Sequence, residues 1–160
     1  MNKIITISRE FGSGGRTIGK LTAQQLGIPC YDAQLIQKIA EESGFSAEYI
    51  QHEDESAGRL DPLFSSRVMG LTIQDRIWHS QRRVILDLAE KGPCVIVGRC
   101  ADHILKEKAD LLRVFIHASV EKRAQRIVSE YGEREESPEQ RIRDKDRRRA
   151  AYHRFYTDMK

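Results

Sequence analysis

Short apolar runs alternate along this chain with longer segments in which apolar residues recur at helical spacing. The run Ile4 to Ile7 is almost wholly apolar and β-branched, and similar runs lie at residues 94–97 and 111–117. Continuous apolar runs of this length are typical of strands that are buried on both faces of a parallel sheet. The pattern therefore predicts three strands at these positions.

The segments between the strands carry helical periodicity and recognisable boundary residues. They predict one helix closed by Gly27, one from the cap Asp32 to Gly44, a short one capped by Ser46, one from about Val68 to Lys91, one from the cap Ser119 to Tyr131, and a last one starting at Ser137 and Pro138. Strands that alternate with helices predict an α/β fold with a doubly wound parallel sheet. Residues 53–67 show no clean period and are expected to form a mobile loop.

Length and composition fit a single soluble domain spanning residues 1–160. Hydrophobic residues make up 39% and charged residues 32% of the chain, which is ordinary for a globular protein. No apolar run approaches the roughly 18 residues that a membrane span needs, and the N-terminus lacks the features of a signal peptide. Three cysteines without a CxxC pair favour a reduced, cytoplasmic chain without a membrane partner.

The distribution of charge is more informative than its sum. A net charge of +3 is too small to indicate nucleic-acid binding, but basic residues crowd the run from Arg141 to Arg154. They lie in the last predicted helical region, at about residues 132–155. A local positive field of this kind suits a partner that carries phosphate, either a nucleotide or an RNA backbone.

A glycine-rich turn follows the first predicted strand and precedes the first predicted helix, an arrangement that cradles phosphate groups. In the register of the motif GxxxxGK[ST] that fits the strand, Arg9 stands at the first glycine and Gly15 at the lysine. Arg16 is the expected substitute, because its planar fork grips phosphate oxygens in bidentate fashion. The predicted cofactor-binding residues are Gly12, Ser13, Gly14, Gly15, Arg16 and Thr17. A tight turn without a ligand is the alternative.

Three blocks extend this reading to a family. The segments ITISREFGSGGRTIGKLTAQQLGIPCYD, GPCVIVGRCADHIL and LLRVFIHASVEKRAQRI, in this order, resemble cytidylate kinases and especially their cytidylate kinase-like branch. The resemblance implies a P-loop fold of the nucleoside monophosphate kinase type, with ATP and Mg²⁺ as cofactors and CMP or dCMP as the phosphate acceptor. Because the chain stops at Lys160, the sheet is expected to lack the strand and helix with which the family continues.

The resemblance also implies roles for particular residues. Arg99, after the strand at 94–97, is expected to hold the acceptor phosphate, and Asp102 is the nearest carboxylate to the position where the family carries an aspartate and this chain has Cys100. Asp146 and Arg149 match an Asp-x-x-Arg pattern of the lid. The implied catalytic residues are Arg16, Arg99, Arg147 and Arg149, and the implied substrate-binding residues are Arg99, Asp102, Arg143, Asp146 and Arg149.

Other interpretations remain open at this point. Because the motif's lysine is absent, the chain could be a nucleotide-binding module without catalysis. The arginines of the last helix could be structural, since Glu139–Arg143 and Asp144–Arg148 are i,i+4 pairs, or they could contact RNA, although nucleic acid is not the expected partner. No metal site within the protein is expected, because Cys100 and His103 have no second pair. Base preference and oligomeric state stay undetermined.

Overall fold

One parallel sheet organises the molecule. The computed structural model describes residues 3–50, 72–108, 110–131 and 137–157. Within these ranges the strands β1 (Ile4–Arg9), β2 (Cys30–Tyr31), β3 (Cys94–Val97) and β4 (Leu111–Ile116) lie in the order β2-β3-β1-β4. The three predicted strands are therefore confirmed, and all the pairings between strands are parallel.

The strand β2 was not predicted. It contains only two residues, too few to carry a periodic signal, and it pairs with β3 through Cys30 opposite Val95. The carbonyl of Pro29 accepts a hydrogen bond from the backbone N–H of Val95 at 2.9 Å. Pairing with β3 therefore defines β2, since the local sequence alone does not specify this strand.

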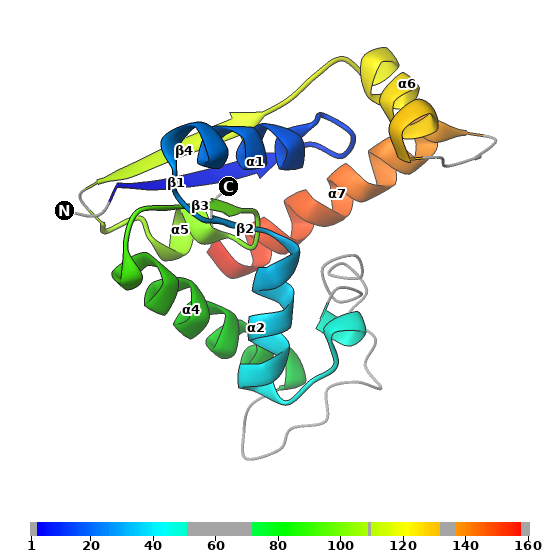
Figure 1. Ribbon diagram of the computed structural model, residues 1–160. Coiled ribbons are helices and arrows are strands. Elements are labelled where there is room, and N and C mark those ends of the chain that lie inside the picture. Colours follow the sequence, from blue (N-terminus) through cyan, green and yellow to red (C-terminus); the bar gives the residue numbers. More distant parts are fainter. Residues whose placement is uncertain (1–2, 51–71, 109, 132–136, 158–160) are drawn as a thin grey trace.

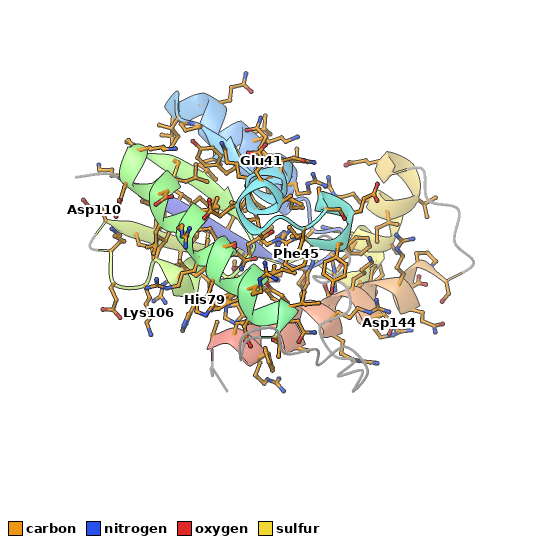
Figure 2. The ribbon with its side chains drawn as sticks, turned by 90° about the horizontal axis from the view of Figure 1, so that it is seen from below. Glu41, Phe45, His79, Lys106, Asp110 and Asp144 are labelled. Carbon is orange, nitrogen blue, oxygen red and sulfur yellow. The ribbon has the colours of Figure 1, made fainter. Side chains whose placement is uncertain are left out.

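Helices cover both faces of the sheet, as the pattern predicted (Figure 1). They are α1 (Gly15–Leu26), α2 (Ala33–Ser43), α4 (Ile73–Lys91), α5 (Ala101–Ile104), α6 (Val120–Tyr131) and α7 (Pro138–Thr157). In β3, Val95 and Val97 face the core under α1, whereas Cys94 and Ile96 face the core shared with α4. Figure 2 shows α2 and α4 lying over that second face, with Glu41 on α2 and His79 on α4. The fold is doubly wound α/β.

Capping residues fix the N-termini of two predicted helices. The long helix begins at Ile73 rather than Val68, because Thr72 has extended dihedral angles and caps it in a reciprocal box with Asp75. The prediction missed this Thr-x-x-Asp signal. Ser46, by contrast, accepts a hydrogen bond from the N–H of Tyr49 at 3.1 Å, which confirms it as a cap of residues 47–50. The predicted mobile loop at 53–67 lies outside the described residues, as do residues 132–136 of the predicted lid region.

The first half of α7 lies near the carboxyl end of β1, because Asp146 accepts a hydrogen bond from Phe11 and Arg149 donates one to the carbonyl of Arg9. In Figure 2, Asp144 of α7 lies at the opposite end of the molecule from Asp110, which precedes β4, and α7 runs back from there. Buried Ile142 of α7 packs with Ala124 and Ile127 of α6, and Phe11 joins this cluster. None of the helices in the described ranges is long and apolar enough to cross a membrane.

Candidate functional site

The carboxyl ends of β1 and β3 frame the candidate site. These strands are neighbours, but the chain leaves β1 toward β2 at one edge and leaves β3 toward β4 at the other. In open α/β sheets, ligands bind outside the carboxyl ends at such a switch point. Two turns border it: residues 10–14 after β1, called the glycine loop below, and Gly98 to Cys100 after β3.

The glycine loop has the geometry of a phosphate cradle. Gly12 and Gly14 have φ angles of 75° and 84°, which favour glycine. A Cβ atom on Gly12 would lie only 3.2 Å from the carbonyl oxygen of Arg123, so a side chain has little room there. The helix α1 begins at Gly15 with no acidic residue in its first turn, which leaves its positive dipole end uncompensated. Loops with this geometry at the start of a helix are typical sites for phosphate groups.

The turn after β3 holds Arg99 in an unusual conformation. Gly98, Arg99 and Cys100 all have positive φ angles, of 79°, 57° and 52°, and each non-glycine residue in this region carries a strain of about 1–3 kcal/mol. The buried amide of Gln81 donates a hydrogen bond to the carbonyl of Arg99 at 2.9 Å, which supports the turn. The guanidinium of Arg99 is turned toward the carbonyl of Ile50, 3.3 Å away, and is almost wholly buried.

The helices α6 and α7 both contact the glycine loop at Phe11. Its N–H donates a hydrogen bond to Asp146 Oδ1 at 2.7 Å, and its carbonyl accepts one from Arg123 Nη1 at 3.1 Å. Arg123 also pairs with Asp146 at 2.6 Å. The guanidinium groups of Arg141 and Arg149 lie over the Phe11 ring, 5.7 and 5.5 Å from its centroid. The structure thus brings the predicted residues Asp146 and Arg149 to the loop.

Arg16 lies at the start of α1, at the edge of this site. Its Nε atom pairs with Asp32 Oδ2 at 2.5 Å, and its side chain is 57% exposed. Asp32 stands at the N-cap position of α2 but makes no side-chain capping hydrogen bond. The prediction that the Asp32 side chain caps α2 was therefore wrong, because Arg16 takes up the carboxylate. Thr17 is exposed beside Arg16.

Three other predicted residues lie apart from the glycine loop. Arg147 is 78% exposed and pairs with Asp144 of its own helix at 3.7 Å, and Arg143 is exposed on α7. Asp102 contacts His153 of α7 through Oδ2 at 3.0 Å. Its Oδ1 atom is buried and has no hydrogen-bond partner in the part of the chain that the structure describes.

Besides Arg141, three arginines that the structure describes at the site were not predicted as site residues. Arg123 fixes the loop as described, and Arg126 lies beside it, since a Cβ on Gly14 would be 3.4 Å from Arg126 Cζ. Their i,i+3 spacing on one predicted helix was the available signal. The third is Arg9, whose side chain crosses Gly15 and reaches Gly98. Its place at the motif's first glycine was visible in the sequence, but the direction of its side chain was not.

The comparisons of the sequence with known proteins agree on one family. The family model described as the cytidylate kinase-like family matches residues 4–160. A cytidylate kinase of Pyrococcus horikoshii is 31% identical over 130 residues, which are 81% of this chain and 58% of that protein. A cytidylate kinase of Methanopyrus kandleri is 26% identical over 153 residues, 90% of this chain and 70% of that protein. The matched region thus spans only part of the length of either relative.

Solved structures are similar over nearly the whole chain. An uncharacterised protein from Eubacterium ventriosum has a TM-score of 0.70 at 30% identity, covering 99% of this chain and 80% of that one. A gluconokinase from Sinorhizobium meliloti (TM-score 0.55, 17% identity, 99% and 98% covered) and a shikimate kinase from Acinetobacter baumannii (0.54, 19%, 97% and 79%) share the fold. The fold is that of the P-loop kinases.

Proposed function

The chain belongs to the cytidylate kinase-like family, and from this premise we propose that it catalyses ATP-dependent phosphoryl transfer to a nucleoside monophosphate. CMP and dCMP are the proposed acceptors, by analogy with the cytidylate kinases that it resembles. A cytoplasmic location belongs to the same proposal and is supported by its three free cysteines.

The observation that carries the proposal is the pair of turns at the carboxyl ends of β1 and β3. The glycine loop, with α1 behind it, supports binding of the donor's phosphates. The neighbouring turn carries Arg99, a fixed positive charge at the end of a buried strand. Phosphoryl transfer needs two phosphate-bearing groups close together, and adjacent strand ends provide two sites for them.

The protein's task in this reaction is to hold the reactants in line and to neutralise charge. ATP supplies the γ-phosphoryl group, with Mg²⁺ bridging its oxygens and held largely through water. Arg149, which donates a hydrogen bond to the Arg9 carbonyl at 3.3 Å, keeps a positive charge beside the glycine loop. Arg99 is proposed to bind the acceptor phosphate. Catalytic roles for Arg16 and Arg147, and acceptor contacts of Asp102, Arg143 and Asp146, remain predictions.

An ADP-release assay tests the proposal. Purified protein with ATP and Mg²⁺ is supplied in turn with CMP, dCMP, UMP and AMP, and ADP is measured by enzymatic coupling. We expect release that depends on the acceptor, fastest with a cytidine monophosphate. Arg99→Ala should raise the KM for the acceptor roughly tenfold to hundredfold, because a charged hydrogen bond contributes about 1.5–3 kcal/mol. Arg82→Ala, an exposed arginine on α4, is the matched control.

A second candidate is nucleotide binding without catalysis, favoured by the glycine at position 15, where the motif has lysine. Titration calorimetry with a nonhydrolysable ATP analogue separates the two functions. Binding of the analogue without ADP release for any of the four acceptors would establish the binding module and reject the kinase. Absence of both would reject the two candidates together.

A further inference from the structure

The space in front of Gly15 is filled by another residue of the site. Gly15 stands where the phosphate-binding motif has its lysine. A Cβ atom on Gly15 would lie 2.7 Å from Arg9 Cβ and 2.9 Å from Arg9 Cγ. These separations are shorter than real carbon–carbon contacts, which lie near 3.5–4.0 Å. The stem of Arg9 therefore occupies the place where a lysine side chain would begin.

The far end of the same side chain reaches the second turn. A Cβ atom on Gly98 would collide with Arg9 Nη1 and would lie 2.9 Å from Arg9 Cζ. Gly98 directly precedes Arg99 and follows β3. The side chain of Arg9 thus extends from Gly15, at the start of α1, to Gly98, which precedes Arg99. Two glycines, at 15 and 98, make room for this one arginine.

We infer that Arg9 supplies the cation that the glycine loop lacks at Gly15, and that it binds the phosphates of the donor nucleotide where they approach the acceptor. The inference rests on the proposed function for the identity of the nucleotide. A guanidinium keeps its charge at all physiological pH values and can bind two phosphate oxygens at once. Arg9 stands one residue before the glycine loop. Its side chain passes through the place where the side chain of the motif's lysine would begin.

The other candidate for this cation is Arg16, which the sequence favoured. Its side chain is 57% exposed and pairs with Asp32 at 2.5 Å. A carboxylate at that distance offsets much of the charge that Arg16 could offer to phosphate, and the exposed part is screened by water. Arg9, by contrast, starts from the central strand β1 and lies between the two turns. Its position between the two turns favours Arg9.

The first test measures binding of the nonhydrolysable ATP analogue by calorimetry, with CMP binding measured separately. Arg9→Ala should weaken the analogue roughly tenfold to hundredfold, the equivalent of one lost charged hydrogen bond, and should change CMP affinity much less. Arg9→Lys should fall between, since it keeps the charge and loses the fork. Arg16→Ala should have a smaller effect than Arg9→Ala. An Arg9→Ala protein that is folded and binds the analogue like the wild type overturns the inference.

The second test moves the positive charge from position 9 to position 15. Gly15→Lys alone should disrupt the loop because the new side chain meets Arg9, and Arg9→Gly alone should lose the cation. The double variant Arg9→Gly/Gly15→Lys restores the first glycine and the lysine of the motif, with Arg16 unchanged, and should recover analogue binding to within about threefold of wild type, a difference below 1 kcal/mol. Thermal unfolding checks that each variant is folded. A folded double variant that binds no better than its weaker parent contradicts the inference.

These outcomes are independent of turnover. Weakened analogue binding in Arg9→Ala, with no ADP release by the wild type for any acceptor, would uphold the inference and reject the kinase activity. If Arg9→Ala changes neither the rate of ADP release nor the affinity for the analogue, the kinase activity is upheld and the inference is rejected. A wild-type protein that does not bind the analogue overturns the inference.

Discussion

The carboxylate of Asp146 accepts a hydrogen bond from the backbone N–H of Phe11 at 2.7 Å, across 135 residues of sequence. The same carboxylate pairs with the buried guanidinium of Arg123 at 2.6 Å. One side chain of α7 therefore holds both the glycine loop and α6. A movement of α7 away from the loop and α6 would break both contacts.

Removing this carboxylate should destabilise the protein. Asp146→Ala removes the nearer of the two carboxylates that pair with Arg123, whose side chain is 6% exposed, and leaves the more distant Glu10 at 3.5 Å. It also removes the acceptor of the Phe11 N–H, and we expect a loss of about 2 kcal/mol in the free energy of unfolding. Asp146→Asn keeps an acceptor for the Phe11 N–H and should lose less. Urea unfolding measures both. Asp144→Ala is the matched control on the same helix, because its partner Arg147 is exposed, and it should cost less than about 1 kcal/mol. Equal losses for Asp144→Ala and Asp146→Ala would contradict the prediction.

Trp78 should report on the packing of α7 against α4. It is the single tryptophan of the chain, and its ring is stacked on Tyr156 of α7 with centroids 4.3 Å apart and planes 10° apart. Tyr156→Leu should shift the tryptophan emission and cost about 1 kcal/mol beyond the lost area. Phe115→Leu, on β4 with 61% exposure, serves as the control. Emission that is identical in Tyr156→Leu and wild type would show that the stack does not form in solution.

The capping box of α4 should contribute measurably to stability. Asp75 accepts from the N–H of Thr72 at 2.9 Å, and its own N–H donates to the Thr72 hydroxyl at 3.1 Å. Asp75→Ala should lower the free energy of unfolding by about 0.5–2 kcal/mol, because the N–H and the hydroxyl of Thr72 lose the carboxylate that accepts from them. Asp87→Ala, exposed in the middle of the same helix, should change it by less than about 0.5 kcal/mol. Guanidinium titration followed by circular dichroism distinguishes them.

The thiol of Cys94 should resist alkylation at neutral pH. Burial, aided by the neighbouring Cys30, raises the pKa of Cys94 from 9.0 to about 11, and the side chain is 1% exposed. Only the thiolate reacts, so modification of native protein by iodoacetamide should be slow at pH 8 and should accelerate with pH up to about 11. Mass spectrometry of the peptide containing Cys94 gives the rate. Rapid labelling at pH 7 would be inconsistent with a raised pKa.

The same pKa has a consequence for stability. The folded state keeps the Cys94 proton where the unfolded chain begins to lose it, so this contribution is complete below pH 9 and fades as the pH rises toward 11. Its full size is on the order of 2–3 kcal/mol. Cys94→Ala should flatten the fall in the unfolding free energy between pH 9 and 11, and an unchanged slope would show that other groups cause it.

The sequence by itself determined the elements that local physics controls. Apolar runs specified β1, β3 and β4, because a strand buried on two faces must be apolar throughout. The glycine-rich turn between a strand and a helix specified the candidate phosphate site, since backbone conformation and helix polarity are local properties. These features, with the blocks that resemble cytidylate kinases, were sufficient for the fold and the family.

Only the tertiary structure decided which side chains surround that turn. Arg16 is adjacent in sequence but pairs with Asp32, whereas Arg123, Asp146 and Arg149 come to the loop from more than a hundred residues away. Arg9 is local, yet its direction depends on the space left by Gly98 in the turn after β3. The strand β2 likewise exists because β3 offers it a partner. The direction of a long, flexible side chain is set by its non-local neighbours, and a linear pattern of residues does not encode them.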